Sequence, residues 1–317
     1  MELDAILTQR GWEKRPSFDL VYSWEDLFAR GLGVPFLYRN RVVEALYRRL
    51  PGKPQVPVRR NCFLMEMEPH VEANVYNRKN IIPYWIDFFL RDSMLPALSR
   101  SYSRCPAVFV SSREVFEFLQ SRQIDLPVYH LPLSLPDHCL NEDWGRKTYD
   151  LVMMGRPNEV LSGFFRQYVE SHSCTYVYRR QEESRFLYFD QDGNCLGNLD
   201  THERYMDLMR RCRIGLYATP GMDAGAERTG GFSQVTPRFL EYLSAGCHVV
   251  LRYVRNADTD FYGLERFCPS IDTYEQFESR VDGCLRASVD RDLYRRYLAG
   301  HVTSARIRTL TKILGQI

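Results

Sequence analysis

Two groups of titratable residues stand at the ends of apolar runs in the first third of the chain. Glu66, Glu68 and His70 lie within five residues, at and just after the end of one apolar run, and Asp87 ends the next. Carboxylates and imidazoles are the usual general bases, and the functional groups of α/β sheets lie beyond the carboxyl ends of the strands. We therefore expect one of these residues to act as a catalytic base. The alternative is that they belong to polar loops of ordinary composition.

A guanidinium and a carboxylate are spaced about one helical turn apart at Arg238 and Glu241. Arg238 comes directly after Pro237, where the pattern predicts the start of a helix. An arginine at a helix N-terminus can neutralise a phosphate, assisted by unpaired backbone N–H groups. The Glu241 carboxylate can accept two hydrogen bonds from a diol. The alternative is that the two side chains form only a solvated pair. Thr236 is either the N-cap of this helix, which we favour, or a phosphate ligand.

Further candidates for phosphate binding lie in two glycine-containing loops. Arg156 follows Gly155, after the apolar run at residues 149–154. The polar loop at residues 219–236 carries Arg228 and two adjacent glycines, which let the backbone approach a ligand closely. Arg228 could therefore bind a phosphate or another acidic ligand. The alternative is that this loop is a mobile excursion from the surface.

The elements that must position these residues follow a regular rhythm. Apolar runs of four to eight residues are typical of buried strands, and their alternation with amphipathic stretches is typical of an α/β fold with a mainly parallel sheet. In the first part of the chain we expect strands at residues 18–23, 34–38, 62–66, 81–87, 107–111 and 128–133, and helices at residues 41–50 and 113–122. Ser112 is expected to cap the second of these helices.

A break in this rhythm divides the chain. Residues 133–147 contain Pro, Asp, Asn and Gly without periodicity, which predicts a linker. After it we expect strands at residues 149–154, 175–179, 214–218 and 248–252, a hairpin at 186–196, and helices at 159–170, 202–212 and 237–245. The last 40 or so residues are helical in pattern. The sequence thus predicts domains at residues 1–137 and 148–285 and a helical tail at residues 286–317.

The order of features between residues 197 and 250 carries a resemblance. Gly-Asn-Leu precedes a helix, a strand and a polar loop, and Pro-Arg-Phe-Leu-Glu-Tyr-Leu-Ser-Ala-Gly-Cys-His-Val-Val follows at residues 237–250. This segment resembles the nucleotide-sugar-binding domain of GT-B glycosyltransferases, in the branch with an Arg-Phe/Tyr-x-Glu signature. His301-x-x-x-x-Arg306 resembles a feature near the end of the same branch. The resemblance covers about 170 residues, and the first 137 match only in general rhythm.

The resemblance implies a fold and a donor site. The fold would be α/β and GT-B-like, with two Rossmann-like domains facing a cleft and a C-terminal helical tail returning toward the first domain. Arg156 and Arg238 would hold the diphosphate of a nucleotide sugar, and Glu241 would hold its ribose. Gly197 and Asn198 match the region where the family holds the base through backbone groups. A plain turn is the alternative for Gly197.

One position departs from the family pattern. A large retaining group of this fold has a second Glu eight residues before the ribose Glu, and this chain has Ser233 there. The sequence therefore leaves the choice between a retaining and an inverting transferase open.

Taken together, the residues and the resemblance predict a glycosyltransferase. It would move a sugar from a nucleoside diphosphate sugar to a saccharide or lipid-linked acceptor, in bacterial polysaccharide or glycan biosynthesis. We expect neither a metal nor a cofactor, because arginines and a helix dipole can stabilise a leaving diphosphate. Two alternatives are a sugar-nucleotide epimerase of the same fold and a catalytically silent GT-B scaffold or binding module.

The composition excludes other classes of protein. Charged residues make up 26% and the net charge is +2, without the basic bias of a nucleic-acid-binding domain. No apolar run approaches the roughly 18 residues of a membrane span, and no signal peptide is visible. The nine cysteines form no Cys-x-x-Cys pair, which favours a reducing cytoplasm. Peripheral contact with anionic lipid is an alternative to a solvated helix face for a basic patch of four arginines. These are Arg39, Arg41, Arg48 and Arg49.

Overall fold

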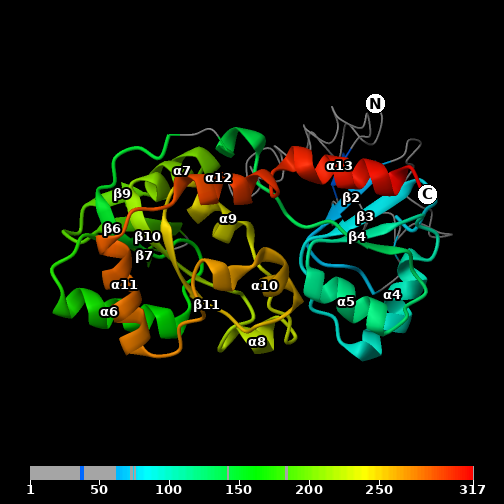
Figure 1. Cartoon of the computed structure of the whole chain (residues 1–317). Coiled ribbons are helices and arrows are strands. Elements are labelled where there is room, and N and C mark those ends of the chain that lie inside the picture. The colour runs from blue at the N-terminus through cyan, green and yellow to red at the C-terminus, as the bar shows by residue number, and fades with distance from the viewer. Residues whose placement is uncertain are drawn as a thin grey trace. The chain divides into compact units, whose positions relative to one another are not determined.

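The computed structural model describes residues 36–38, 62–71, 74, 76–140, 143–182 and 185–316. The expected strand at residues 18–23, the helix at 41–50 and the basic patch at residues 39–49 lie outside the described residues. Contacts between Cα atoms divide the chain into two compact units. The first comprises Met1–Leu133 and Thr303–Ile317, and the second comprises Ser134–Val302. Figure 1 shows the elements of both.

The first unit contains a parallel sheet with the strand order β1-β2-β3-β4-β5 in its described part. The strands are β1 (Phe36–Tyr38), β2 (Cys62–Glu66), β3 (Ile81–Trp85), β4 (Val108–Val110) and β5 (Val128–His130). The helices are the 3-10 helix η2 (Asp92–Met94), α4 (Leu95–Tyr102), α5 (Arg113–Ser121) and α13 (Thr303–Leu314). Helix α13 packs Leu310 against Phe63 and Phe109, on the face of the sheet opposite α4 and α5 (Figure 1).

The second unit contains a sheet with the order β11-β10-β6-β7-β8-β9. The pairs from β11 to β7 are parallel, whereas β8 and β9 are antiparallel to their neighbours. The strands are β6 (Tyr149–Val152), β7 (Tyr176–Glu182), β8 (Arg185–Asp190), β9 (Cys195–Gly197), β10 (Cys212–Ala218) and β11 (His248–Arg252). The helices are η3 (Asp137–Leu140), α6 (Glu159–Ser171), α7 (His202–Arg210), α8 (Gly225–Arg228), α9 (Pro237–Ser244), α10 (Ala257–Tyr262), η4 (Leu264–Arg266), α11 (Tyr274–Arg286) and α12 (Arg291–Ala299).

The predicted fold class is confirmed: the protein is α/β, with two Rossmann-like sheets and C-terminal helices. The predicted strand bounds are met at both ends for β2 and β11. Ser112 caps α5 by accepting a hydrogen bond from the Val115 backbone N–H at 3.2 Å. Helices α4 and α10 were not predicted, because α4 opens with Leu-Pro and α10 is a short, largely polar segment.

The strand order of the second unit creates a switch point beside β6. The chain passes from β6 to β7 on one side and later returns to place β10 on the other side. In open α/β sheets, ligands bind outside the carboxyl ends of the strands at such a point. The Tyr242 hydroxyl joins the two strand ends there. It accepts a hydrogen bond from the Met154 backbone N–H at 2.9 Å and donates one to the Leu216 carbonyl at 3.3 Å.

A glycine in β10 allows this contact. A Cβ atom built on Gly215 would overlap the aromatic ring of Tyr242, so the ring of this α9 residue lies directly on the strand backbone. The same helix ends before Gly246, which has a φ of 68° and lies against the indole of Trp144. The C-terminal half of the α9 segment therefore needs glycine at two points of close approach.

None of the helices in the described part of the chain is both long enough and apolar enough to cross a lipid bilayer.

Replacing Gly215 with Ala should lower the free energy of unfolding by about 1–3 kcal/mol, because the added methyl group overpacks the layer between β10 and α9. The matched change Gly163→Ala adds a methyl group within α6, where nothing lies within 4 Å. That control should be neutral or stabilise by about 0.5–1 kcal/mol. Denaturant unfolding followed by circular dichroism measures both. Equal midpoints for G215A and the wild type would contradict the need for glycine.

Candidate functional site

Arg238 lies against the loop that follows β6. It is the second residue of α9, and its guanidinium occupies the space that a Cβ on Gly155 would fill. Gly155 has a φ of 70°, which also favours glycine. The Arg238 Nε donates a hydrogen bond to the Tyr205 hydroxyl of α7 at 3.1 Å. The predicted phosphate-binding arginine is thus held at the carboxyl end of β6 by contacts from two directions.

The surroundings of Arg238 keep it charged. Burial by itself lowers the pKa of the guanidinium, but interactions with Tyr205, Tyr242 and Glu241 outweigh burial, so the pKa of Arg238 is raised. A guanidinium at this position carries a fixed positive charge with N–H donors in a planar fork, the geometry that suits a phosphate.

Glu241 is buried one turn further along α9. Its Oε1 lies 3.3 Å from Nε2 of His202, the first residue of α7. His202 therefore belongs to the same group of side chains, although it was not among the predicted site residues. The signal that could have found it is its place directly after Thr201, the N-cap of a predicted helix that follows Gly197 and Asn198.

Thr236 occupies the predicted N-cap position of α9, but its side chain makes no capping hydrogen bond. The predicted N-cap position is therefore confirmed, without a capping hydrogen bond from the side chain. The Thr236 Oγ1 donates instead to the Tyr217 hydroxyl at 3.3 Å, and the Thr236 backbone N–H donates to the same oxygen at 2.8 Å. Burial raises the pKa of Tyr217 to about 12, so this hydroxyl stays protonated at neutral pH.

The other donor-site candidates of the second unit lie at different places. Arg156 is exposed, next to Gly155 in the loop after β6. Gly197 ends β9 with a φ of 96° and pairs with Tyr188 of β8, and Asn198 follows it half-buried. The Tyr188 hydroxyl accepts a hydrogen bond from the Gly155 backbone N–H at 3.2 Å. The loop after β6 thus joins Arg156 and Arg238 to the β8–β9 pair that ends at Gly197.

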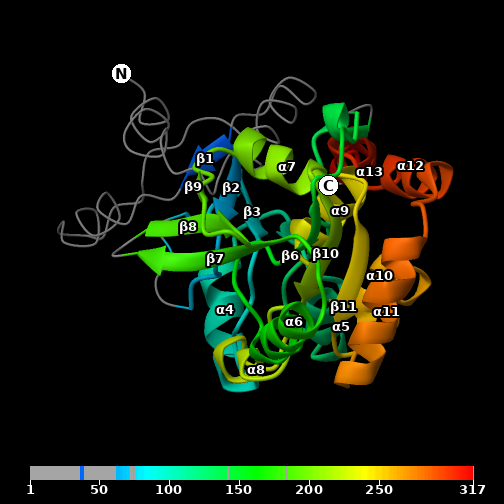
Figure 2. The same ribbon diagram turned by 90° about the vertical axis from the view of Figure 1, so that its left-hand side faces the viewer.

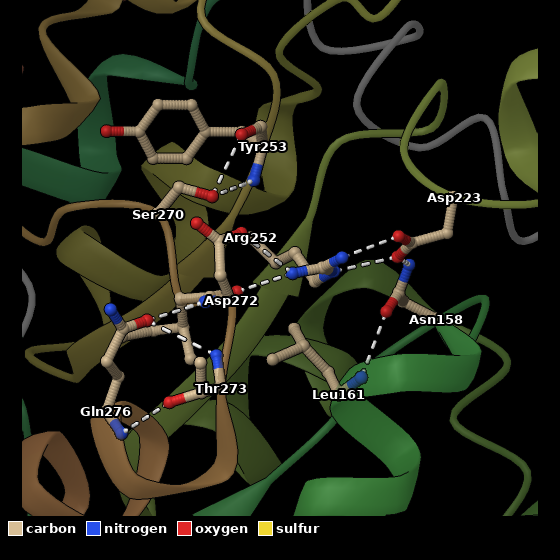
Figure 3. Close-up of polar contacts among 10 residues, drawn as sticks. Asn158, Leu161, Asp223, Arg252, Tyr253, Ser270, Asp272, Thr273 and Gln276 are labelled. Carbon is tan, nitrogen blue, oxygen red and sulfur yellow. Dashed lines mark hydrogen bonds and ion pairs between the residues drawn. The ribbon is translucent and has the colours of Figure 1, made fainter.

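The loop at residues 219–236 is tied to the sheet at Asp223, as Figure 3 shows. Arg252, at the end of β11, donates two hydrogen bonds to the Asp223 carboxylate, at 2.8 Å from Nε and 2.7 Å from Nη2. The Asn158 side-chain amide donates to the same carboxylate at 2.7 Å, while its oxygen caps α6 at Leu161 (Figure 3). Arg252 also donates to the Ile271 carbonyl and to Asp272. This network anchors the first part of the loop.

Two other loop residues behave differently. Arg228 is exposed on α8, and its Nη2 donates to the Pro220 carbonyl at 3.2 Å. Ser233, which stands where the retaining group has its second Glu, is buried, and its hydroxyl lies 2.6 Å from that of Thr219. The Ser233 side chain therefore makes a hydrogen bond within the loop.

In the first unit, Glu66 is buried at the end of β2. Its Oε2 accepts hydrogen bonds from the Trp85 indole at 3.1 Å and from the Tyr102 hydroxyl at 2.7 Å. The same hydroxyl accepts one from the His70 backbone N–H at 2.8 Å. Glu66 therefore positions the loop after β2, and its burial separates it from the other predicted bases.

Those other bases lie on two neighbouring loops. Glu68 is exposed, and His70 and Asp87 are half-buried. The Asp87 backbone N–H donates to the Met67 carbonyl at 2.7 Å, so the loops after β2 and β3 run side by side. This contact brings Asp87 next to the segment that carries Glu68 and His70.

His130 lies at the same carboxyl edge of the first sheet and was not among the predicted site residues. It ends β5, and its Nε2 lies 3.3 Å from the Ser111 carbonyl. Burial first, and then the charges of Arg113 and Arg306, lower the pKa of His130 to about 4. The imidazole is therefore neutral at pH 7. A histidine within the apolar run at residues 128–133 was the available signal.

The two residues of the tail resemblance fall in different units. His301 is buried against the rings of Tyr262 and Tyr297, with centroids 5.2 Å and 4.5 Å away. Arg306 is a buried residue of α13 in the first unit.

The described part of the chain holds no group of three or more His, Cys, Asp or Glu side chains that could bind a metal ion. The three Asp-x-Asp stretches, at residues 190–192, 258–260 and 290–292, serve the fold, and Asp290 of the third caps α12 by accepting from the Leu293 backbone N–H at 2.9 Å. Asp190 accepts hydrogen bonds from the backbone of the hairpin turn, and Asp258 accepts one from the Val235 backbone N–H at 2.7 Å.

By its fold, the protein belongs to the α/β class and is built from two Rossmann-like units. No protein-family model matches the chain, and no curated protein matches it. Solved structures do. The GtfA/B complex is 11% identical, with a TM-score of 0.48, and the match covers 87% of this chain and 60% of that one. The pneumococcal O-GlcNAc transferase GtfA, solved with UDP and GlcNAc, is 12% identical, with a TM-score of 0.49 over 86% of this chain and 59% of that one. An alpha,alpha-trehalose-phosphate synthase (UDP-forming) from Burkholderia vietnamiensis is 14% identical, with a TM-score of 0.48, and the match covers 99% of this chain and 86% of that one. The chain spans about three fifths of the length of the first two.

Replacing Tyr102 with Phe should lower the free energy of unfolding by about 1–3 kcal/mol, because it removes a donor to the buried Glu66 and an acceptor for the His70 N–H. Thermal unfolding measures the loss. Tyr129→Phe is the matched control, since the Tyr129 ring lies half-buried on the same sheet. A Y102F protein as stable as the control would contradict the positioning role of Glu66.

Replacing Asp223 with Asn should destabilise the second unit by about 2 kcal/mol at pH 7, because charge-assisted hydrogen bonds to Arg252 are lost. Arg252 holds the pKa of Asp223 below its usual value, so the carboxylate stabilises the fold above the pKa of the unfolded chain, near 4. That contribution is lost as the pH falls through the lowered pKa.

The difference between wild type and D223N in urea unfolding should therefore be constant above about pH 5 and shrink as the pH falls below about 4. Asp200→Asn, which removes an exposed ion pair with Arg204, should cost less than about 1 kcal/mol. A pH-independent difference would show that the Asp223 charge is not what holds the loop.

Proposed function

We propose that this chain is a GT-B-like glycosyltransferase that moves a sugar from a nucleoside diphosphate sugar to a saccharide or lipid-linked acceptor, in bacterial polysaccharide or glycan biosynthesis. The observation that carries the proposal is the Arg238 guanidinium packed against Gly155 at the switch point of the second sheet. Ligands bind at such points in α/β sheets, and a fixed guanidinium fork there suits a phosphate.

The donor-binding roles follow from this placement. Arg238 and the neighbouring Arg156 would hold the diphosphate, and Glu241, oriented by His202, would accept hydrogen bonds from the ribose diol. Gly197 and Asn198, which lead from β9 to α7, would hold the base through their backbone groups. Arg228, exposed on α8, would contact phosphate or an acidic sugar.

The reaction needs one bond to break and one to form. The bond between the anomeric carbon of the sugar and the terminal phosphate oxygen breaks, and its electron pair stays on that oxygen. A new bond joins the anomeric carbon to the acceptor hydroxyl, and the hydroxyl proton passes to a base. Asp87, Glu68 and His70 of the first unit are the candidates for this base, because Glu66 is buried and already accepts two hydrogen bonds. In this proposal the arginines and the N-terminus of α9 balance the charge of the leaving diphosphate without a metal.

The nucleotide part of the proposal predicts a ligand-dependent shift in melting temperature. A nucleoside diphosphate at 100 times its Kd should stabilise the wild type by about 2.7 kcal/mol. Arg238→Lys keeps the charge and loses the planar fork, so the Kd should rise about tenfold or more. Arg255→Lys, at an exposed ion pair with Asp260, should leave it unchanged. A panel of nucleotides and nucleotide sugars is measured by thermal shift and calorimetry.

The transfer part is tested by following nucleoside diphosphate release. Release that requires an acceptor supports transfer, whereas isomerisation of the donor without an acceptor would indicate an epimerase. A panel in which no nucleotide shifts the melting temperature and no donor turns over would overturn the proposal.

A further inference from the structure

The β7–β8 pair extends past the carboxyl end of β6, the strand with which β7 pairs. β7 pairs with β6 only through Tyr176 and Val177, and then continues as an antiparallel ribbon with β8 as far as Glu182. Figure 2 shows the two strands projecting side by side. Residues 178–182 of β7 thus lie beyond the carboxyl end of β6, on the side where the loop with Gly155 begins.

One face of this ribbon is directed at that loop. Arg179 and Tyr188 are direct cross-strand partners, and such partners project from the same face of a sheet. The Tyr188 hydroxyl accepts the Gly155 backbone N–H at 3.2 Å, and the Arg238 guanidinium lies against the same glycine. Arg179 is therefore on the face of the ribbon that meets the proposed diphosphate site.

The Arg179 guanidinium is held with its donors available. Its Cζ lies 4.0 Å from the centre of the Phe186 ring, so the ring covers a flat face of the guanidinium. Stacking of this kind leaves the N–H groups at the edge, and within the described residues the Arg179 side chain makes neither a hydrogen bond nor an ion pair.

The charges around Arg179 favour an anion. Burial first, and then Arg238 and Arg156 among its neighbours, lower the pKa of Arg179, which shows that three guanidiniums lie within electrostatic reach of one another. Within the described residues none of the three forms an ion pair, although Arg238 also interacts with Glu241 at longer range. An anion bound among them relieves their mutual repulsion.

We propose that Arg179 is a third diphosphate-binding arginine, which contacts the phosphates from the β7–β8 ribbon and favours the leaving nucleoside diphosphate over the intact donor. This inference rests on the proposed function. When the sugar leaves, the electron pair of the broken bond stays on the terminal phosphate, which gains one negative charge. A cation beside the diphosphate interacts more strongly with that product-like state than with the donor, and only such a difference raises the rate of the chemical step.

The test compares Arg179→Gln with Arg180→Gln by titration calorimetry. Arg180 is the matched control, because it projects from the opposite face of the ribbon and its Cζ lies 4.3 Å from the Phe189 ring. The probes are UDP, GDP, ADP and CDP, the corresponding monophosphates, and inorganic pyrophosphate as a probe without a base. In R179Q the Kd of the diphosphates and of pyrophosphate should rise about tenfold or more, and the Kd of the monophosphates should rise by no more than about threefold. R180Q should bind all of these probes as the wild type does.

Kinetics give a second readout. R179Q should lower kcat for transfer more than it raises the donor KM, and Arg179→Lys should restore part of kcat. The melting temperature without ligand shows whether each variant is folded, and the Lys variant decides the question if the Gln variant is not.

Three results would overturn the inference. One is a diphosphate affinity of R179Q within twofold of the wild type while R238K loses affinity, which would leave the proposed function intact. Another is an equal loss in R179Q and R180Q, which would indicate a general effect of ribbon charge. The third is a wild-type protein that binds none of the diphosphates, which would overturn the proposed function as well.

Discussion

Helix α9 can perform its role only because two glycines let it approach the sheet. Tyr242 lies on the backbone of β10 at Gly215, and Arg238, one turn earlier on the same face of the helix, lies on the loop after β6 at Gly155. A side chain at either glycine would separate the helix from the strand ends. The Tyr242 hydroxyl then joins β6 to β10, and the guanidinium of Arg238 is fixed at the switch point. The orientation of Glu241 toward α7 follows from the same placement.

Buried and half-buried charges elsewhere in the molecule serve to hold loops. The bidentate pair of Arg252 with Asp223 ties the polar loop to β11 and to the N-terminus of α6, and Glu66 ties the loop after β2 to Tyr102. Each of these charges has several hydrogen-bond partners, which offset the cost of removing it from water. The arginines at the switch point differ from them, because Arg156, Arg179 and Arg238 form no ion pair within the described residues. That contrast separates charges that stabilise the fold from charges suited to a ligand.

Much of the fold could be predicted from local patterns. The apolar runs predicted β2 and β11 to the residue, and Asp-Gly predicted the turn between β8 and β9. Local patterns do not predict hydrogen bonds to distant partners. Thr236 is the N-cap residue of α9, as predicted, yet its hydroxyl donates to Tyr217 of β10 and accepts no hydrogen bond from the first turn of the helix.

The sequence by itself determined the alternation of strands and helices, the start of α9 and the identity of Arg238 and Glu241 as candidates, because periodicity and helix starts depend on residues only a few positions apart. Only the tertiary structure decided that Glu66 is buried while Glu68 is exposed, and that His202 and Arg179 stand near the ends of α9 and β6. Burial, charge and hydrogen-bond partners depend on segments that are distant in the chain and meet only when the sheet forms.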